Sequence, residues 1–177
     1  ANDFRAKEPS VTLKAAEAAG PIKIELTGDD GAVTNLKDGL SMPEGTIVDA
    51  TFMSVAALKT FYQEQIDKTL EDGTLFSLHM KATMMKVSDP IIFGHAVKVY
   101  FKPVFDKYGE VLDEIGVDVN NGFGDLVSKI EQLSADKKRE IQTDIDACFE
   151  NGPDLAMVNS DKAITNRFTQ NDGVGRN

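Results

Sequence analysis

A lysine at the end of a predicted strand is the residue of this chain best placed for chemistry. Residues 74–81 alternate in polarity, so that apolar side chains share one face while His79 and Lys81 share the other. Small and polar residues then lead to Asp89, which we expect to cap a helix with Pro90 at its first position. Ligands of α/β proteins gather where strands end and helices start. Desolvation there lowers a lysine's pKa, so the segment predicts proton exchange at Lys81.

The same segment also has plain structural interpretations. Most lysines are solvated surface groups, and that remains the competing interpretation of Lys81 on the residues alone. His79 and His95 lack a shared ligand spacing, and an isolated histidine is more often a hydrogen-bonded structural residue than a metal ligand or a base. Met84 and Met85 are expected to fill core space.

Other signatures of chemistry are missing from the sequence. It contains no P-loop, no Cys/His zinc spacing and no nucleophile elbow. Gly122-Phe123-Gly124 is a bare G-x-G that follows a loop, which favours a turn before a helix over a dinucleotide site. The single cysteine, Cys148, excludes an intrachain disulfide, and its spacing from Ile141 and Ile145 predicts packing on an apolar helical stripe.

The composition and net charge limit the classes of partner that this chain can bind. The 177 residues carry 29 acidic against 19 basic side chains, a formal net charge of -10. This charge repels nucleic acid and anionic membranes, so neither is an expected partner. An anionic substrate would require basic groups from another part of the protein. We find no signal-peptide pattern and no apolar run of about 18 residues, and we therefore expect a cytoplasmic protein.

The first third of the chain is patterned for β-structure. Residues 22–26 alternate as a half-buried strand, residues 28–31 supply a turn, and residues 33–36 can return as the second arm of a hairpin. Residues 46–52 form another β-branched stretch. We expect one lobe over residues 1–177, of mixed α/β (α+β) class, in which strand–helix units packed in layers follow this β-rich part.

Helical spacing dominates the remainder. The predicted helices run from a Ser54 cap to Gly73, from Asp89 to a break at Pro103, through Leu126–Leu133, and from a Ser134 cap to about Phe149. A short buried strand is expected after the last helix, at Leu155–Val158.

One long motif resembles a known family. Leu78 to His95 is similar to the corresponding stretch of the monomeric NADP-dependent isocitrate dehydrogenases. Shorter stretches such as Asn120–Gly122 and Leu155–Lys162 fall in register with it. The resemblance covers residues 2 to about 166, whereas Arg167–Asn177 departs from the family's pattern.

The resemblance implies a function, and it also implies that this chain is only part of the enzyme that performs it. Family members are longer chains, so this would be an internal fragment of their large domain. They oxidise isocitrate with NADP and decarboxylate the product to 2-oxoglutarate, aided by Mg²⁺ or Mn²⁺. The family's catalytic lysine maps onto Lys81, which would also contact substrate, as would Thr83, whereas Lys86 would be a supporting charge.

NADP and the metal would be bound mainly by segments outside this chain, so the isolated chain is predicted to be inactive. Its partners would be isocitrate and the remainder of the parent enzyme. The alternative function is a non-catalytic α/β binding or interaction module that retains the family scaffold. A proteolytic remnant with purely structural contacts is the third possibility.

Overall fold

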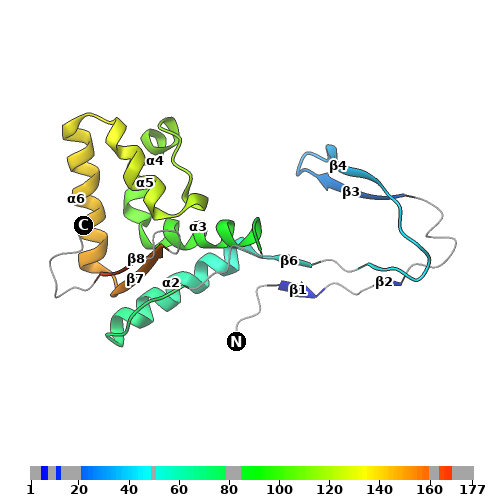
Figure 1. Cartoon of the computed structure of the whole chain (residues 1–177), viewed down its shortest axis with the longest axis horizontal. Coiled ribbons are helices and arrows are strands. Elements are labelled where there is room, and N and C mark those ends of the chain that lie inside the picture. Colours follow the sequence, from blue (N-terminus) through cyan, green and yellow to red (C-terminus); the bar gives the residue numbers. More distant parts are fainter. Residues whose placement is uncertain are drawn as a thin grey trace. The chain divides into compact units, whose positions relative to one another are not determined.

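The chain divides into two compact units, described here from a computed structural model (Figure 1). The structure describes residues 5–7, 11–12, 21–48, 51–78, 85–159 and 164–168. We call residues 1–54 the hairpin unit and residues 55–177 the helical unit. Strands dominate the first and helices the second, which confirms the mixed α/β class with a β-rich beginning. A single lobe over residues 1–177 stays a prediction.

The hairpin unit is built around one antiparallel pair. Strand β3 (Ile22–Thr27) pairs with β4 (Val33–Leu40), which confirms the predicted hairpin and extends its second arm. The turn closes where the Gly28 amide donates to the carbonyl of Ala32 at 2.9 Å. Gly31 adopts a φ of 78°, which favours glycine.

Two shorter antiparallel pairs complete this unit. Strand β1 (Arg5–Lys7) pairs with β6 (Thr51–Met53), and β2 (Val11–Thr12) pairs with β5 (Ile47–Val48). The predicted β-stretch over residues 46–52 is therefore confirmed as two short strands, with residues 49–50 outside the described part of the chain.

Helix α2 (Val55–Glu71) opens the helical unit where the predicted Ser54 boundary placed it. Its buried stripe consists of Leu58, Tyr62 and Ile66. Gly73 ends the helix with a φ of 61°, and the Thr74 amide donates to the Thr69 carbonyl at 2.9 Å. These are the features of a glycine-terminated helix end, as the sequence predicted.

The next two helices are separated by one residue. Helix α3 (Ser88–Tyr100) gives way at Phe101 to α4 (Lys102–Glu114), and Pro103 lies in the first turn of α4. The predicted break and restart at this proline is confirmed, because Pro fits the first turn of a helix and cannot continue one. The single junction residue, Phe101, is 1% exposed.

The second half of the helical unit differs in detail from expectation. The single helix predicted through Leu126–Leu133 is an α-helix, α5 (Phe123–Lys129), followed by a 3₁₀ turn, η2 (Ile130–Gln132). Helix α6 (Ala135–Asn151) follows, and the amide of Lys137 donates to the Ser134 hydroxyl at its start. That cap confirms the predicted boundary.

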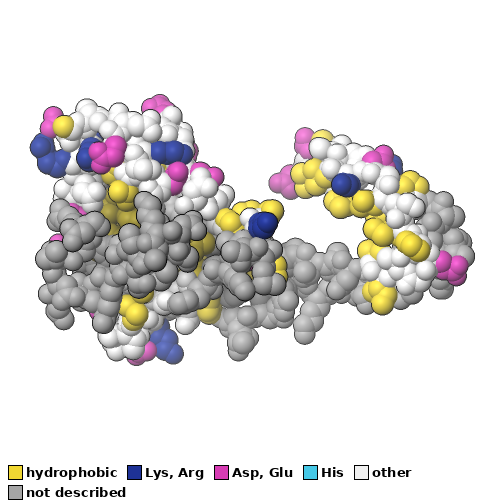
Figure 2. All heavy atoms as spheres, in the orientation of Figure 1, with side chains coloured by type: hydrophobic (Ala, Val, Ile, Leu, Met, Phe, Trp, Pro, Cys, Tyr) yellow, Lys and Arg dark blue, Asp and Glu magenta, His cyan; other side chains and the backbone are white. Residues whose placement is uncertain are grey.

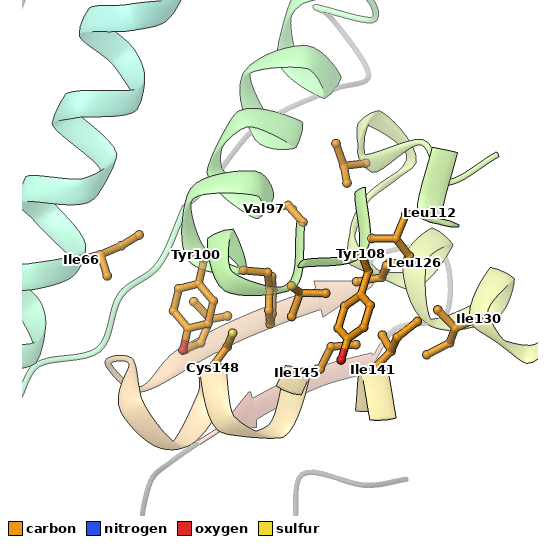
Figure 3. Packing of buried hydrophobic residues seen from close by; sticks show 14 residues of the cluster. Ile66, Val97, Tyr100, Tyr108, Leu112, Leu126, Ile130, Ile141, Ile145 and Cys148 are labelled. Atoms are coloured by element: carbon orange, nitrogen blue, oxygen red, sulfur yellow. The ribbon is translucent and has the colours of Figure 1, made fainter. Parts of the chain in front are cut away.

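The core of the helical unit is aromatic at its centre. Phe101 stacks on Phe123 with 4.5 Å between ring centroids and meets Phe149 edge-on at 5.2 Å. Tyr100 packs on Phe101 edge-on at 4.9 Å. Figure 3 shows the surrounding buried side chains pointing toward one another between the helices. The labelled members are Ile66, Val97, Tyr100, Tyr108, Leu112, Leu126, Ile130, Ile141, Ile145 and Cys148.

The chain returns as β-structure after α6. Strand β7 (Leu155–Asn159), predicted as Leu155–Val158, pairs antiparallel with β8 (Ile164–Phe168). Leu155 is buried and belongs to the core cluster. None of the helices that the structure describes is long and apolar enough to cross a membrane.

Candidate functional site

The predicted site falls at a gap in the described residues. Lys81 and Thr83 lie outside them, as does His79, so their placement stays a prediction. The chain is described up to Leu78 and again from Met85. The site is therefore built from these two flanks and from the elements that hold them.

The first flank is tied to the strand that follows α6. The Phe76 amide donates to the Asp154 carbonyl at 2.8 Å, and the Ala156 amide donates to the Phe76 carbonyl at 3.4 Å. These bonds form one parallel bridge between Phe76 and Leu155. The strand predicted over residues 74–81 is wrong for residues 74–78, because a strand needs a ladder of partners and the described residues supply a single bridge.

The second flank is the start of helix α3. The Asp89 amide donates to the Met85 carbonyl at 3.1 Å, and the helix begins at Ser88, one residue before the predicted cap. Val87 occupies the N-cap position with helical backbone angles and no side-chain cap. Asp89 therefore does not cap the helix. It lies buried in the first turn, where a negative charge complements the helix dipole.

The side chains just before α3 are solvent-facing. Met85 is 56% exposed and Val87 is 76% exposed, and Lys86 between them is exposed as well. The expectation that Met85 fills core space is wrong, because this exposed residue is not part of the buried cluster. Lys86 lies at the surface, and its role as a supporting charge stays a prediction.

Helix α3 is held closely against the Asn120 turn. A Cβ placed on Gly94 would lie 2.5 Å from Asn120 Oδ1 and 3.3 Å from Asn120 N. The turn is a 3₁₀ helix, η1 (Val119–Asn121), rather than the loop that the sequence predicted. Tyr62 of α2 reinforces the same helix by donating its hydroxyl to the Ile92 carbonyl at 3.3 Å. The second flank is thereby fixed from two sides.

Two carboxylates that the sequence analysis missed shape this turn. The Asp118 side chain accepts from the Asn120 amide at 2.9 Å, and Asp125 accepts from the Asp118 amide at 2.8 Å. That backbone hydrogen bond, followed by the Lys129 ammonium 3.0 Å away, lowers the pKa of Asp125. The contact between Asp118 and Asn120 could have been predicted from the sequence, because an aspartate side chain often accepts from the backbone amide two residues ahead.

His95 lies on α3, half-buried and between cations. Its pKa is lowered by burial first, and then by the positive charges of Lys59 and Lys98. The imidazole is therefore neutral near pH 7. Among the described residues, no group of three or more His, Cys, Asp or Glu side chains could hold a metal ion.

Cys148 is a packing residue, as the sequence predicted. Its side chain is buried, and burial followed by the charge of Asp144 raises the pKa of the thiol. A thiol in this setting stays protonated and is a poor nucleophile.

A polar cluster that the sequence did not predict joins α4 to α6. The Tyr108 hydroxyl donates toward Asp144 Oδ2 at 2.5 Å and Glu140 Oε1 at 3.0 Å. The Lys107 ammonium lies 2.8 Å from the same Asp144 oxygen, and the Lys137 ammonium lies 3.0 Å from Glu140 Oε2. Both ammonium groups also lie over the Tyr108 ring. The cluster ties two core helices together.

Comparison with known proteins places the chain in a family. The sequence model of monomeric isocitrate dehydrogenase matches residues 1–174. "Isocitrate dehydrogenase [NADP] 2" of Mycobacterium tuberculosis is 46% identical over 172 residues, which cover 97% of this chain and 23% of the relative. "Isocitrate dehydrogenase [NADP]" of Azotobacter vinelandii gives the same figures, and that of Corynebacterium glutamicum is 46% identical over 174 residues, 98% of this chain and 23% of the relative.

The chain belongs to the monomeric isocitrate dehydrogenase family, and it spans about a quarter of the length of these relatives. The family match confirms the resemblance inferred from the motif. It also corrects the expected boundary, because the match continues past residue 166 to residue 174.

Proposed function

We propose that this chain is an internal part of an NADP-dependent isocitrate dehydrogenase and that it contributes the acid–base residue Lys81. The observation that carries the proposal is the family match over residues 1–174, together with relatives whose names include isocitrate and NADP. The proposal includes a cytoplasmic location.

Lys81 would handle the proton of the reaction. Oxidation of a secondary alcohol removes a hydride from carbon and a proton from the hydroxyl oxygen. A neutral Lys81 amine beside that oxygen would take the proton, and the Thr83 hydroxyl would hydrogen-bond to the substrate. Such assistance is typically worth about 10²–10⁴-fold in rate.

The cofactors are assigned to other segments. NADP would accept the hydride, and the family's divalent metal is Mg²⁺ or Mn²⁺. The described residues offer that metal no cluster of ligands, so no catalytic step of this chain is assigned through it. We assign the binding of NADP and metal to the remaining length of the parent protein.

The fold supports this role through its two flanks. The bridge at Phe76 and the helix start at Ser88 hold the ends of the intervening segment to β7 and to the Asn120 turn. A lysine between two held ends loses less conformational entropy when it positions a substrate.

The test compares two lysines of one motif in the full-length parent enzyme. Lys81→Met keeps most of the apolar stem and removes the ammonium, so turnover should fall by about 10²–10⁴-fold. Lys86→Met removes an exposed charge and should leave turnover within about threefold of the unchanged enzyme. Both are measured with saturating isocitrate, NADP and metal, and thermal unfolding verifies that each variant is folded.

Two outcomes would count against the proposal. Normal turnover in Lys81→Met, with loss of turnover in Lys86→Met, would show that the acid–base residue is Lys86 and not Lys81. A correctly folded parent that lacks isocitrate oxidation altogether would favour the non-catalytic binding module.

A further inference from the structure

The β3–β4 hairpin has two chemically different faces. Side chains alternate along a strand, so Ile22, Ile24 and Leu26 share one face of β3. Lys23 and Glu25 point to the other face. The hairpin is therefore amphipathic along β3.

The register extends the apolar face onto β4. Leu40 pairs with Ile22 and Thr34 pairs with Leu26, and directly paired residues share a face. The register shifts between Glu25 and Ile24, so Leu36 and Lys37 both oppose Ile24, and Lys37 is the one charged residue that shares this side. We call Ile22, Ile24, Leu26, Leu36 and Leu40 the apolar hairpin face.

A second register shift brings Leu40 onto this side. Between Ile24 and Ile22 the partner strand advances from Lys37 to Leu40, one residue more than β3 does. Gly39 lies in this interval with a φ of 71°, a conformation that suits the extra residue of a bulge. This is the second of two irregularities in the hairpin, and together they bring Leu40 opposite Ile22 on the side of the apolar residues.

This face is exposed to solvent in the 177-residue chain. Leu26 is 56% exposed, Ile24 and Leu36 are exposed to a similar degree, and none of residues 21–48 is buried. Figure 2 shows hydrophobic side chains gathered at the surface over β3 and β4. An isolated two-stranded hairpin is at best marginally stable in water, and it needs a further partner to bury its apolar side.

The length of the relatives indicates the partner. The matched region is 23% of the Mycobacterium tuberculosis relative, so most of a family member's polypeptide lies outside the part that this chain represents. The helical unit, by contrast, contains a buried cluster of apolar side chains of its own. The apolar hairpin face is thus an exposed apolar surface that further residues of the same polypeptide can cover.

We propose that, in the full-length parent protein, the apolar hairpin face is covered by apolar side chains from polypeptide outside these 177 residues. The proposal rests on the inference that the chain is part of a longer enzyme. It assigns the hairpin a docking role within that enzyme, separate from the chemistry of Lys81.

The experiment compares two positions with equal exposure on opposite faces. Leu26 belongs to the apolar hairpin face, whereas Val33 pairs with Thr27 on the other face and is 59% exposed. Leu26→Cys and Val33→Cys are each made in the 177-residue chain and in the full-length parent. Their rates of alkylation by a maleimide are read by peptide-resolved mass spectrometry, which separates them from the buried Cys148.

In the 177-residue chain both cysteines should react at similar rates. In the parent, Leu26→Cys should react at least about tenfold more slowly than Val33→Cys. A covered cysteine reacts only when its surroundings open locally, and an opening free energy of about 1.4 kcal/mol slows the reaction tenfold. Equal rates for the two positions in the parent would overturn the proposal. Protection of Leu26→Cys in the 177-residue chain that grows with protein concentration would also overturn it, because a second copy would then be the occupant.

A second measurement guards against a variant that fails to fold. Hydrogen exchange of the amides of β3 and β4 in the unsubstituted parent should be slower than in the 177-residue chain, and unchanged exchange would overturn the proposal. Neither readout requires turnover. A parent that protects Leu26 but does not oxidise isocitrate would sink the proposed function and leave this inference standing.

Discussion

The hairpin unit and the helical unit use apolar residues with opposite results. In the hairpin unit β3 and β4 pair along their length, and Ile24, Leu26 and Leu36 remain exposed. In the helical unit Phe101, Val104 and Leu126 are almost fully buried. Backbone pairing fixes the register of two strands without any core, whereas burial needs a second layer of structure. The helical unit contains that layer and the described part of the hairpin unit does not.

The difference follows from how the helices face one another. Helix α4 presents a stripe of Val104, Tyr108 and Leu112, and α6 presents Ile141 and Ile145 toward it. Phe101 stacks on Phe123 in the same core, and Figure 3 shows Tyr108, Leu112, Ile141 and Ile145 among its buried side chains. Stability in this chain should therefore reside in the helical unit.

The largest effect is expected at the centre of that core. Phe101→Ala removes a ring that is stacked and buried, and it should lower the free energy of unfolding of the helical unit by about 3–5 kcal/mol. Leu26→Ala in the hairpin of the 177-residue chain should change it by no more than about 0.5 kcal/mol. Urea unfolding followed by circular dichroism measures both. Equal losses would mean that the hairpin unit contributes to the same core.

A smaller effect is expected where two elements touch. Gly94→Ala places a methyl group 2.5 Å from the Asn120 side-chain oxygen and 3.3 Å from the Asn120 backbone nitrogen, and it should cost about 1–3 kcal/mol. Gly109, in the middle of α4, has open space around its Cα, so Gly109→Ala should instead stabilise by about 0.5–1 kcal/mol. The same unfolding experiment distinguishes the two signs. Stabilisation by Gly94→Ala would show that α3 does not depend on the close approach to η1.

The smallest expected effect is a change in the pH at which the tyrosines ionise. The chain has three tyrosines and no tryptophan, and all three tyrosines lie in the helical unit. Burial raises the pKa of Tyr62 and of Tyr100, and burial together with the hydrogen bond to Asp144 raises the pKa of Tyr108 to about 12. Ultraviolet titration of the native chain should therefore show little phenolate near pH 10, where a free tyrosine ionises.

The stability consequence has a definite sign. Above about pH 10 the unfolded chain releases tyrosine protons that the folded chain keeps, so the free energy of unfolding falls as the pH rises through this range. Tyr108→Phe should flatten the fall, because one of the three groups is removed. A native tyrosine that ionises near pH 10 would contradict the burial of these rings.

Local signals predicted much of the fold correctly. The turn at residues 28–31, the glycine that ends α2 and the Ser134 cap each act through neighbours in the sequence, so their structural results could be predicted without tertiary information. The misses were of another kind. Residues 74–78 alternate like a strand and form one bridge, and Asp89 has the sequence of a cap and lies inside the helix.

The sequence alone indicated the family, through the long motif from Leu78 to His95, and it predicted the β3–β4 hairpin and the order of the main helices. Tertiary structure decided which of the described apolar residues are buried. Gly94 carries no sign in the sequence that it faces Asn120, and Tyr108 carries none that it bonds Asp144. Such contacts depend on where distant elements meet, and periodicity within one element contains no information about that position. For the apolar hairpin face the deciding contacts lie, by our proposal, beyond these 177 residues.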